Sequence, residues 1–150
     1  MNVDCDFENV IKKDDPELVE KLLKTGLCFS EDNASWLAMN GFIKCLKVYY
    51  KYGKEHKEDL VSALHVATSH GKLEILKYLY TVNVKFDKDL IIEAGRYGHY
   101  DTLVWLFKTV FQSKKRNISE EINEAFLYAV ENNDVRMAKW IYEVAAIKGK

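Results

Sequence analysis

The stretch SALHVATSHGKLEILKYLY, residues 62–80, decides the predicted fold, because its apolar residues recur at helical spacing on both sides of one glycine. Gly71 is the residue type that best tolerates the left-handed backbone between two helices. The stretch therefore predicts two short helices joined by a tight turn at Gly71. It contains no nucleophile with a base, no metal-ligand spacing and no phosphate-binding loop.

Similar segments recur before and after this stretch. The residues that match Gly71 are Asp14, Gly41, Gly98 and Asn133, at intervals of 27 (14 to 41), 30 (41 to 71), 27 (71 to 98) and 35 residues (98 to 133). All are Gly, Asn or Asp, which suit a tight turn or a helix cap. The repetition predicts five helical hairpins.

Apolar residues keep the same register around each turn residue. They fall two, four, five, eight and nine positions after it, a stripe wider than one on a surface helix. Four positions before it, the residues are apolar and mostly small, namely Val10, Leu37, Ala67, Ala94 and Ala129. Because each hairpin is too small to bury its own stripe, neighbouring hairpins must stack on it. The pattern predicts a single all-α domain over residues 1–150. The expected hairpins span residues 4–26, 33–53, 61–82, 88–110 and 119–147.

The stretch at residues 62–71 resembles an ankyrin repeat, whose signature is T-P-L-H-x-A followed by a glycine. Ser62, Ala63, Leu64, His65 and Ala67 occupy the signature positions before Gly71. The resemblance implies an ankyrin-like solenoid. Two intervals of 27 residues, against about 33 in the family, imply shortened fingers. The style is similar to ankyrin arrays encoded by large DNA viruses, which implies a viral protein that engages a host factor in the host cytoplasm.

Composition limits the classes of function. With 22 basic and 23 acidic residues the net charge is -1, so no global attraction draws the chain to nucleic acid or to an anionic membrane. We expect no membrane partner, since no apolar run approaches the roughly 20 residues that span a bilayer. The first ten residues do not resemble a secretory signal. Three scattered cysteines indicate reduced thiols and a cytoplasmic location.

Residues that could support catalysis or metal binding have simpler structural roles. His65 and His70 are five apart, so they do not share a helical face as a metal pair would. The family resemblance implies that His65 makes hydrogen bonds between repeats. The acid pairs at 14–15 and 120–121 stand where helices begin, and Cys45 falls in the core register. We therefore predict a protein that is not an enzyme, with no catalytic residue, metal or cofactor.

The predicted function is binding of another protein on the concave face, with no small-molecule substrate. In the family, the two residues before each turn often face that side. The matching residues are Met39, Asn40, Ser69, His70, Arg96, Tyr97, Glu131 and Asn132. Arg96 and Tyr97 are the strongest candidates, because both types are enriched in binding hot spots. The chain is expected to be a monomer or a weak homodimer.

Three alternatives stay open. A lysine-rich face around residues 44–57 would suit a nucleic-acid-binding helical repeat, although Glu55, Glu58 and Asp59 dilute it. An enzyme on a helical scaffold would need convergent polar groups that the sequence lacks. The stripe Tyr78, Trp105 and Trp140, seven positions after the turns, is either packed on a neighbouring helix or an exposed ridge for a partner. The polar loop at 111–119 has no assigned role.

Overall fold

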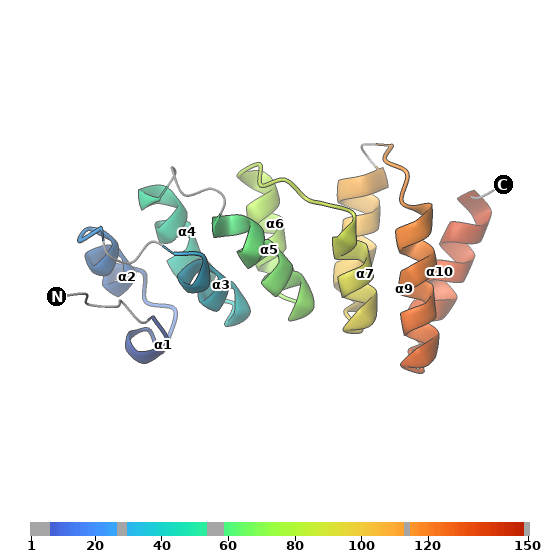
Figure 1. Cartoon of the computed structure of the whole chain (residues 1–150), viewed down its shortest axis with the longest axis horizontal. Coiled ribbons are helices and arrows are strands. Elements are labelled where there is room, and N and C mark those ends of the chain that lie inside the picture. The colour runs from blue at the N-terminus through green and yellow to red at the C-terminus, as the bar shows by residue number, and fades with distance from the viewer. Residues whose placement is uncertain (1–6, 27–29, 54–58, 113–114, 149–150) are drawn as a thin grey trace. The chain divides into compact units, whose positions relative to one another are not determined.

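The structure is a computed structural model of the whole chain, which describes residues 7–26, 30–53, 59–112 and 115–148. All regular elements in these ranges are helices, and none is a strand (Figure 1). The prediction of an all-α fold is confirmed. By its internal contacts the chain divides into two compact units. Unit 1 takes in residues up to 67 together with 74–85, and unit 2 takes in 68–73 together with the chain from 86 onward.

Unit 1 is built from short amphipathic helices. They are α1 (Phe7–Val10), α2 (Pro16–Leu23), α3 (Glu31–Met39), α4 (Ile43–Tyr52), α5 (Asp59–Ser69) and α6 (Leu73–Thr81). Residues 68–73, which end α5 and begin α6, belong to unit 2. Helices α2 and α3 both lie against α4, and α1 lies against α3. The buried apolar residues are Ile11, Val19, Leu23, Ala34, Leu37, Ala38, Cys45, Leu46, Tyr49, Leu60, Ala63, Leu64, Ala67, Ile75, Leu76 and Leu79.

Polar side chains fix the helix starts of unit 1. Asp15 accepts a hydrogen bond from the Leu18 N–H of the first turn of α2, as a helix cap does. Asp14 accepts from the N–H groups of Lys44 (3.1 Å) and Cys45 (2.8 Å), so it caps α4 from another hairpin. The adjacent acids therefore have structural roles.

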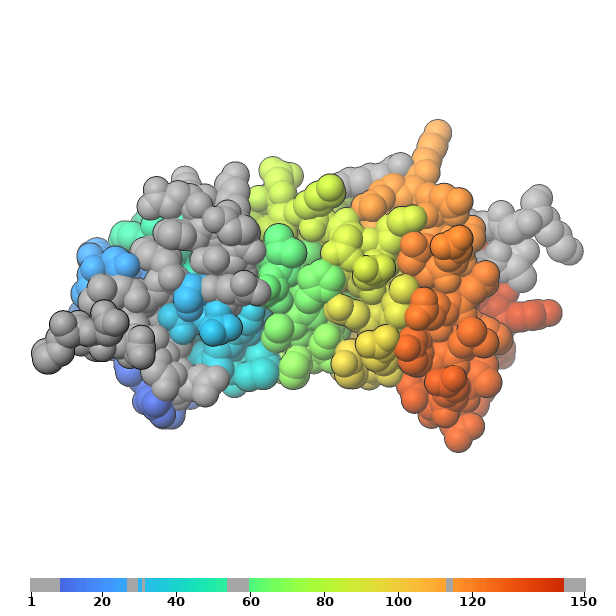
Figure 2. All heavy atoms as spheres, viewed as in Figure 1, coloured from blue at the N-terminus to red at the C-terminus, as the bar shows by residue number. Residues whose placement is uncertain are grey.

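Within its described residues, unit 2 has four α-helices and one π-helix. They are α7 (Asp89–Arg96), α8 (Tyr100–Trp105), the π-helix η1 (Leu106–Gln112), α9 (Ser119–Glu131) and α10 (Val135–Lys148). Helix α9 packs against both α7 and α10. Figure 2 shows the atoms of α7 and α9 meeting along their length. The buried apolar residues are Phe86, Leu90, Ile91, Ala94, Leu103, Leu106, Phe107, Val110, Phe111, Ile118, Ile122, Ala125, Ala129, Met137 and Ile141.

Glycine permits a close contact between two helices of unit 2. A Cβ built on Gly95 would lie 2.7 Å from the Ala125 Cβ and 2.8 Å from the Ala125 Cα. Such distances are far below van der Waals contact, so only glycine allows α7 to approach α9 this closely.

The predicted turn residues mostly adopt the expected backbone. Gly41, Gly71, Gly98 and Asn133 all have positive φ, between 55° and 74°. The N–H groups of Phe42, His99 and Asp134 close the turns onto carbonyls five residues earlier, which is the Schellman pattern. Asp14 differs from these four residues, because its φ is not positive and its carboxylate caps α4, which is the other role that the sequence allowed for it.

The predicted apolar register is confirmed in the middle of the chain. Four, five and eight positions after the turns at Gly41, Gly71 and Gly98, every side chain is buried. Before the first turn the register slips, since Val10 is 43% exposed and Ile11 is fully buried. Helix α1 ends at Val10, so the helical spacing no longer fixes which residue points inward.

The long interval between Gly98 and Asn133 is filled partly by the π-helix. Leu106, Phe107, Val110 and Phe111 of η1 are all buried. The wider π turn extends the second helix of this hairpin while these four side chains stay in the core.

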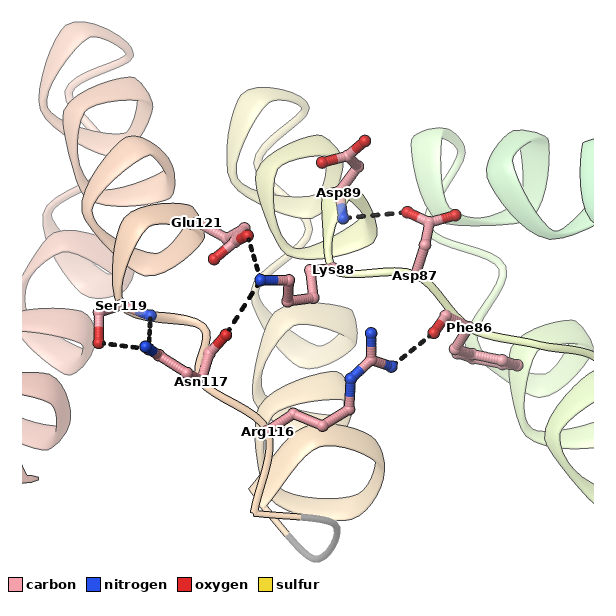
Figure 3. Close-up of polar contacts among 8 residues, drawn as sticks. All are labelled: Phe86, Asp87, Lys88, Asp89, Arg116, Asn117, Ser119 and Glu121. Atoms are coloured by element: carbon pink, nitrogen blue, oxygen red, sulfur yellow. Dashed lines mark hydrogen bonds and ion pairs between the residues drawn. The ribbon is translucent and has the colours of Figure 1, made fainter.

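A polar cluster holds the connection after η1, as Figure 3 shows. Arg116 donates from Nη1 to the Phe86 carbonyl at 2.8 Å and stacks on the Phe111 ring. Lys88 Nζ lies 3.2 Å from both the Asn117 carbonyl oxygen and Glu121 Oε1. The segment 115–118 is therefore tied back to the start of α7, and Arg116 has a structural role there.

Candidate functional site

The predicted partner-binding residues stand at the ends of the first helices of their hairpins. Met39 and Asn40 end α3 in unit 1, the first half-buried and the second exposed. The other six residues belong to unit 2 and are called here the turn-end surface. They are Ser69, His70, Arg96, Tyr97, Glu131 and Asn132, and all except the half-buried Ser69 are exposed.

Arg96 is held in place on the turn-end surface by Tyr128. Its Nη2 donates to the Tyr128 hydroxyl at 2.9 Å, and its guanidinium carbon lies 4.9 Å from the centre of the Tyr128 ring. The hydrogen bond raises the pKa of Arg96 above its ordinary value, so the side chain stays cationic. Because the guanidinium has five donors, others remain for a ligand.

Asn132 connects the neighbouring hairpin to Arg96. Its Nδ2 donates to the Arg96 carbonyl oxygen at 3.0 Å, which joins the end of α9 to the end of α7. Tyr97, next to Arg96, is 52% exposed. A fixed cation therefore lies beside an exposed aromatic ring, with an acid, Glu131, on the neighbouring helix end.

His99 connects the Gly71 turn to the rest of the turn-end surface. Its Nε2 lies 2.7 Å from the Ser69 carbonyl oxygen, so this nitrogen carries the proton and donates. A Cβ on Gly71 would lie 2.5 Å from the His99 Nδ1, so the ring packs directly on the glycine. The sequence predicted neither this contact nor the role of Tyr128. The sequence positions could have indicated both contacts. His99 directly follows the turn residue Gly98, and Tyr128 lies one helical turn before Asn132 on α9.

Cys45 and His65 were considered for catalysis or metal binding, and both lie in the described ranges. Cys45 is fully buried, and burial together with the Asp14 carboxylate raises the pKa of its thiol to about 12, so it stays protonated at neutral pH. His65 is half-buried in α5, and its predicted hydrogen bonds between repeats stay a prediction. Within the described ranges, no group of three or more His, Cys, Asp or Glu could hold a metal ion. Cys5, Cys28 and His56 lie outside those ranges.

The lysine-rich face is only partly covered by the described residues, because Lys54 and Lys57 lie outside them. Lys44, Lys47 and Lys51 are exposed on α4. Lys47 Nζ lies 5.5 Å from the centre of the Tyr78 ring and Lys51 Nζ lies 5.4 Å from that of Tyr52. The Tyr52 hydroxyl in turn donates to Glu20, which lowers the pKa of that carboxyl, so an anion lies on the same side of the unit.

The aromatic stripe is half-buried and packed on other rings. Tyr78 meets Tyr50 edge-on with ring centres 6.4 Å apart, and Trp105 meets Phe86 at 6.0 Å. Trp140 contacts Phe107 at 5.4 Å and Tyr100 at 6.3 Å. These edge-on pairs stabilise the packing of neighbouring helices within each unit and leave no free ridge of tryptophans.

In the described part of the chain, no helix has the length and apolar character needed to cross a bilayer. Comparison with models of known families, with curated proteins and with solved structures found no match.

Proposed function

We propose that this chain is a non-catalytic, ankyrin-like helical-repeat protein that binds another protein through the turn-end surface. The ankyrin-like interpretation rests on the signature residues at 62–71 and on the glycine turns at Gly41, Gly71 and Gly98 with positive φ. The shortened fingers are supported by the connection at 82–88, which is short and contains no strand.

The observation that carries the binding proposal is the arrangement around Arg96. Its guanidinium is held by the hydroxyl and the ring face of Tyr128, and Tyr97 is exposed beside it. A side chain that is already ordered loses little conformational entropy when a partner binds. Arg and Tyr are also the residue types that contribute most to protein interfaces, the first through its planar fork and the second through its rigid ring.

A partner with an acidic or carbonyl-rich segment fits this surface best. The free donors of Arg96 can bind a carboxylate through two parallel hydrogen bonds. The exposed Tyr97 ring can pack on apolar side chains of the same partner. For a nucleic-acid partner we would require several convergent cations, whereas Arg96 is accompanied by Glu131 on the neighbouring helix end.

Replacement of Arg96 and Tyr97 together by alanine tests this proposal. We expect the double variant to keep its helicity and to melt within a few degrees of the wild type, because both side chains are exposed. Capture of the partner from cells that make the protein should weaken more than about tenfold, or about 1.4 kcal/mol. Circular dichroism and quantitative affinity capture measure the two effects.

Arg136→Ala is the matched control for Arg96. Arg136 is also exposed in unit 2 and also lies over a tyrosine ring, 3.8 Å from the centre of Tyr100, but it lies outside the turn-end surface. The variant should capture the partner as the wild type does. Loss of the partner from a Lys44→Ala, Lys47→Ala and Lys51→Ala variant, with capture intact in the Arg96 and Tyr97 variant, would show that the lysine-rich face binds instead.

The cytoplasm is the compartment that we propose for this binding. Support comes from the scattered cysteines, of which Cys45 is buried as a protonated thiol. A viral origin, with a host factor as partner, rests only on the resemblance to viral ankyrin arrays.

A further inference from the structure

The packing of the last two hairpins shows which positions one hairpin uses to receive the next. Relative to the turn at Gly98, the residues three before, two after and nine after are Gly95, Tyr100 and Phe107. Gly95 takes the Ala125 side chain of α9 against its backbone. Tyr100 and Phe107 hold the Trp140 ring of α10 edge-on, at 6.3 and 5.4 Å.

The same three positions in the last hairpin are apolar and exposed. Relative to Asn133 they are Val130, Val135 and Tyr142, which are 52%, 74% and 68% exposed. In the preceding hairpin the equivalent residues are buried or half-buried by the next hairpin. The last hairpin of the described chain therefore keeps a stacking face of the kind that elsewhere in unit 2 is covered.

A groove follows this face between α9 and α10. It has a volume of about 480 Å³ and is lined by Phe126, Ala129, Val130, Val135, Ala138 and Tyr142 together with the charged Asp134 and Lys139. Of the residues that line it, Ala129 is fully buried and Ala138 is half-buried, whereas Val135 and Tyr142 are largely exposed. One face thus carries both a depression and the projecting side chains that could fill one.

We propose that a second copy of this chain docks on this face to form a two-fold symmetric dimer, with the α9 and α10 surfaces of the two copies packed together. A two-fold interface uses the same patch on both copies, so that patch must be complementary to itself. This one is complementary in shape, because Tyr142 and Val135 of each copy can enter the groove of the other. It is also complementary in charge, because one acid, Asp134, and one base, Lys139, line the groove. Its apolar character continues the hairpin-to-hairpin packing of unit 2.

Sedimentation equilibrium of the purified 150-residue chain tests the proposal. The wild type should show a concentration-dependent equilibrium between monomer and dimer. Val135→Glu and Tyr142→Glu, made separately, each place an uncompensated charge in the interface and should raise the Kd of the dimer by at least about tenfold. Both side chains are largely exposed in the monomer, so the melting of dilute samples should stay that of the wild type.

Leu127→Glu is the matched control, because Leu127 is an apolar residue of α9 that is 60% exposed and does not line the groove. It should dimerise as the wild type does. A wild type that stays monomeric at every concentration would overturn the proposal. So would open assemblies larger than a dimer, which indicate a head-to-tail contact, or a Leu127→Glu variant that loses the dimer while Tyr142→Glu keeps it.

Discussion

Replacement of Gly95 by leucine is expected to lower the free energy of unfolding by about 4 kcal/mol and Tm by about 10 °C. Even a single added carbon at this position meets the Cβ of Ala125 at 2.7 Å, the Cα at 2.8 Å and the carbonyl oxygen at 3.2 Å. Two of these atoms belong to the backbone, which cannot rotate away, so α7 and α9 must separate. Thermal and urea unfolding followed by circular dichroism measure the loss.

Gly95→Ala and Ala125→Gly, combined, separate a steric cause from a change in helix propensity. Alanine favours a helix over glycine by about 1 kcal/mol, so propensity alone predicts that Gly95→Ala is stabilising. The contact predicts destabilisation, which Ala125→Gly should partly relieve because it removes the nearest atom. The double variant should therefore have a higher free energy of unfolding than the sum of the two single effects predicts. Additive effects, or a stabilised Gly95→Ala variant, would show that the helices do not approach this closely.

Gly71→Ala should destabilise the protein by about 3 kcal/mol, for two reasons that act together. At φ 66° any side chain strains the backbone. The new Cβ would also lie 2.5 Å from the His99 ring, which must move and give up its hydrogen bond to the Ser69 carbonyl. The decrease in Tm measures the total effect.

Gly98→Ala is the matched control for Gly71→Ala. It occupies the same position of the next hairpin, has φ 74°, and would meet nothing closer than Asp134 Oδ2 at 3.8 Å. Gly98→Ala should lower the free energy of unfolding only by the cost of the backbone strain, about 1 kcal/mol. In a His99→Ala background the two alanine variants should become nearly equal. If Gly71→Ala and Gly98→Ala lower the stability by the same amount with His99 present, the His99 ring does not pack on Gly71 as described.

The repeated turns were the part of the fold that the sequence predicted best. Gly41, Gly71, Gly98 and Asn133 are types that favour positive φ, and a local backbone preference acts whatever the surroundings. Asp14 belongs to a type that is also a good helix cap. Only the neighbouring α4 decides between the two roles, and a single sequence does not show which helix will lie there.

The contacts between hairpins could not be predicted from the sequence pattern, because the pattern shows which positions are apolar but not which residues meet. A glycine inside a helix, such as Gly95, usually indicates a lower helix propensity, and its use as a contact appears only when Ala125 is placed against it. The partners of Trp140 depend on which faces meet, and the sequence left a buried and an exposed role open. The π-helix at 106–112 depends in the same way on core packing.

The candidate binding residues were predicted from the family resemblance, but the side chains that hold them in place were not predicted. The sequence placed Arg96 and Tyr97 directly before a turn, where helix ends leave side chains accessible. Tyr128 stands 32 residues after Arg96 and became its partner only through the packing of α7 on α9. The side chain that orders the guanidinium was therefore missed.

The most direct test of the central claim, that a protein partner binds at the turn-end surface, is photo-cross-linking in cells that make the chain. A benzophenone amino acid is introduced in place of Tyr97 in one variant and in place of Lys47, exposed on α4, in another. We predict one covalent adduct of defined mass, containing a second protein, from position 97 and none from position 47. An adduct from position 47 alone, or an adduct that nuclease treatment removes, would contradict the account.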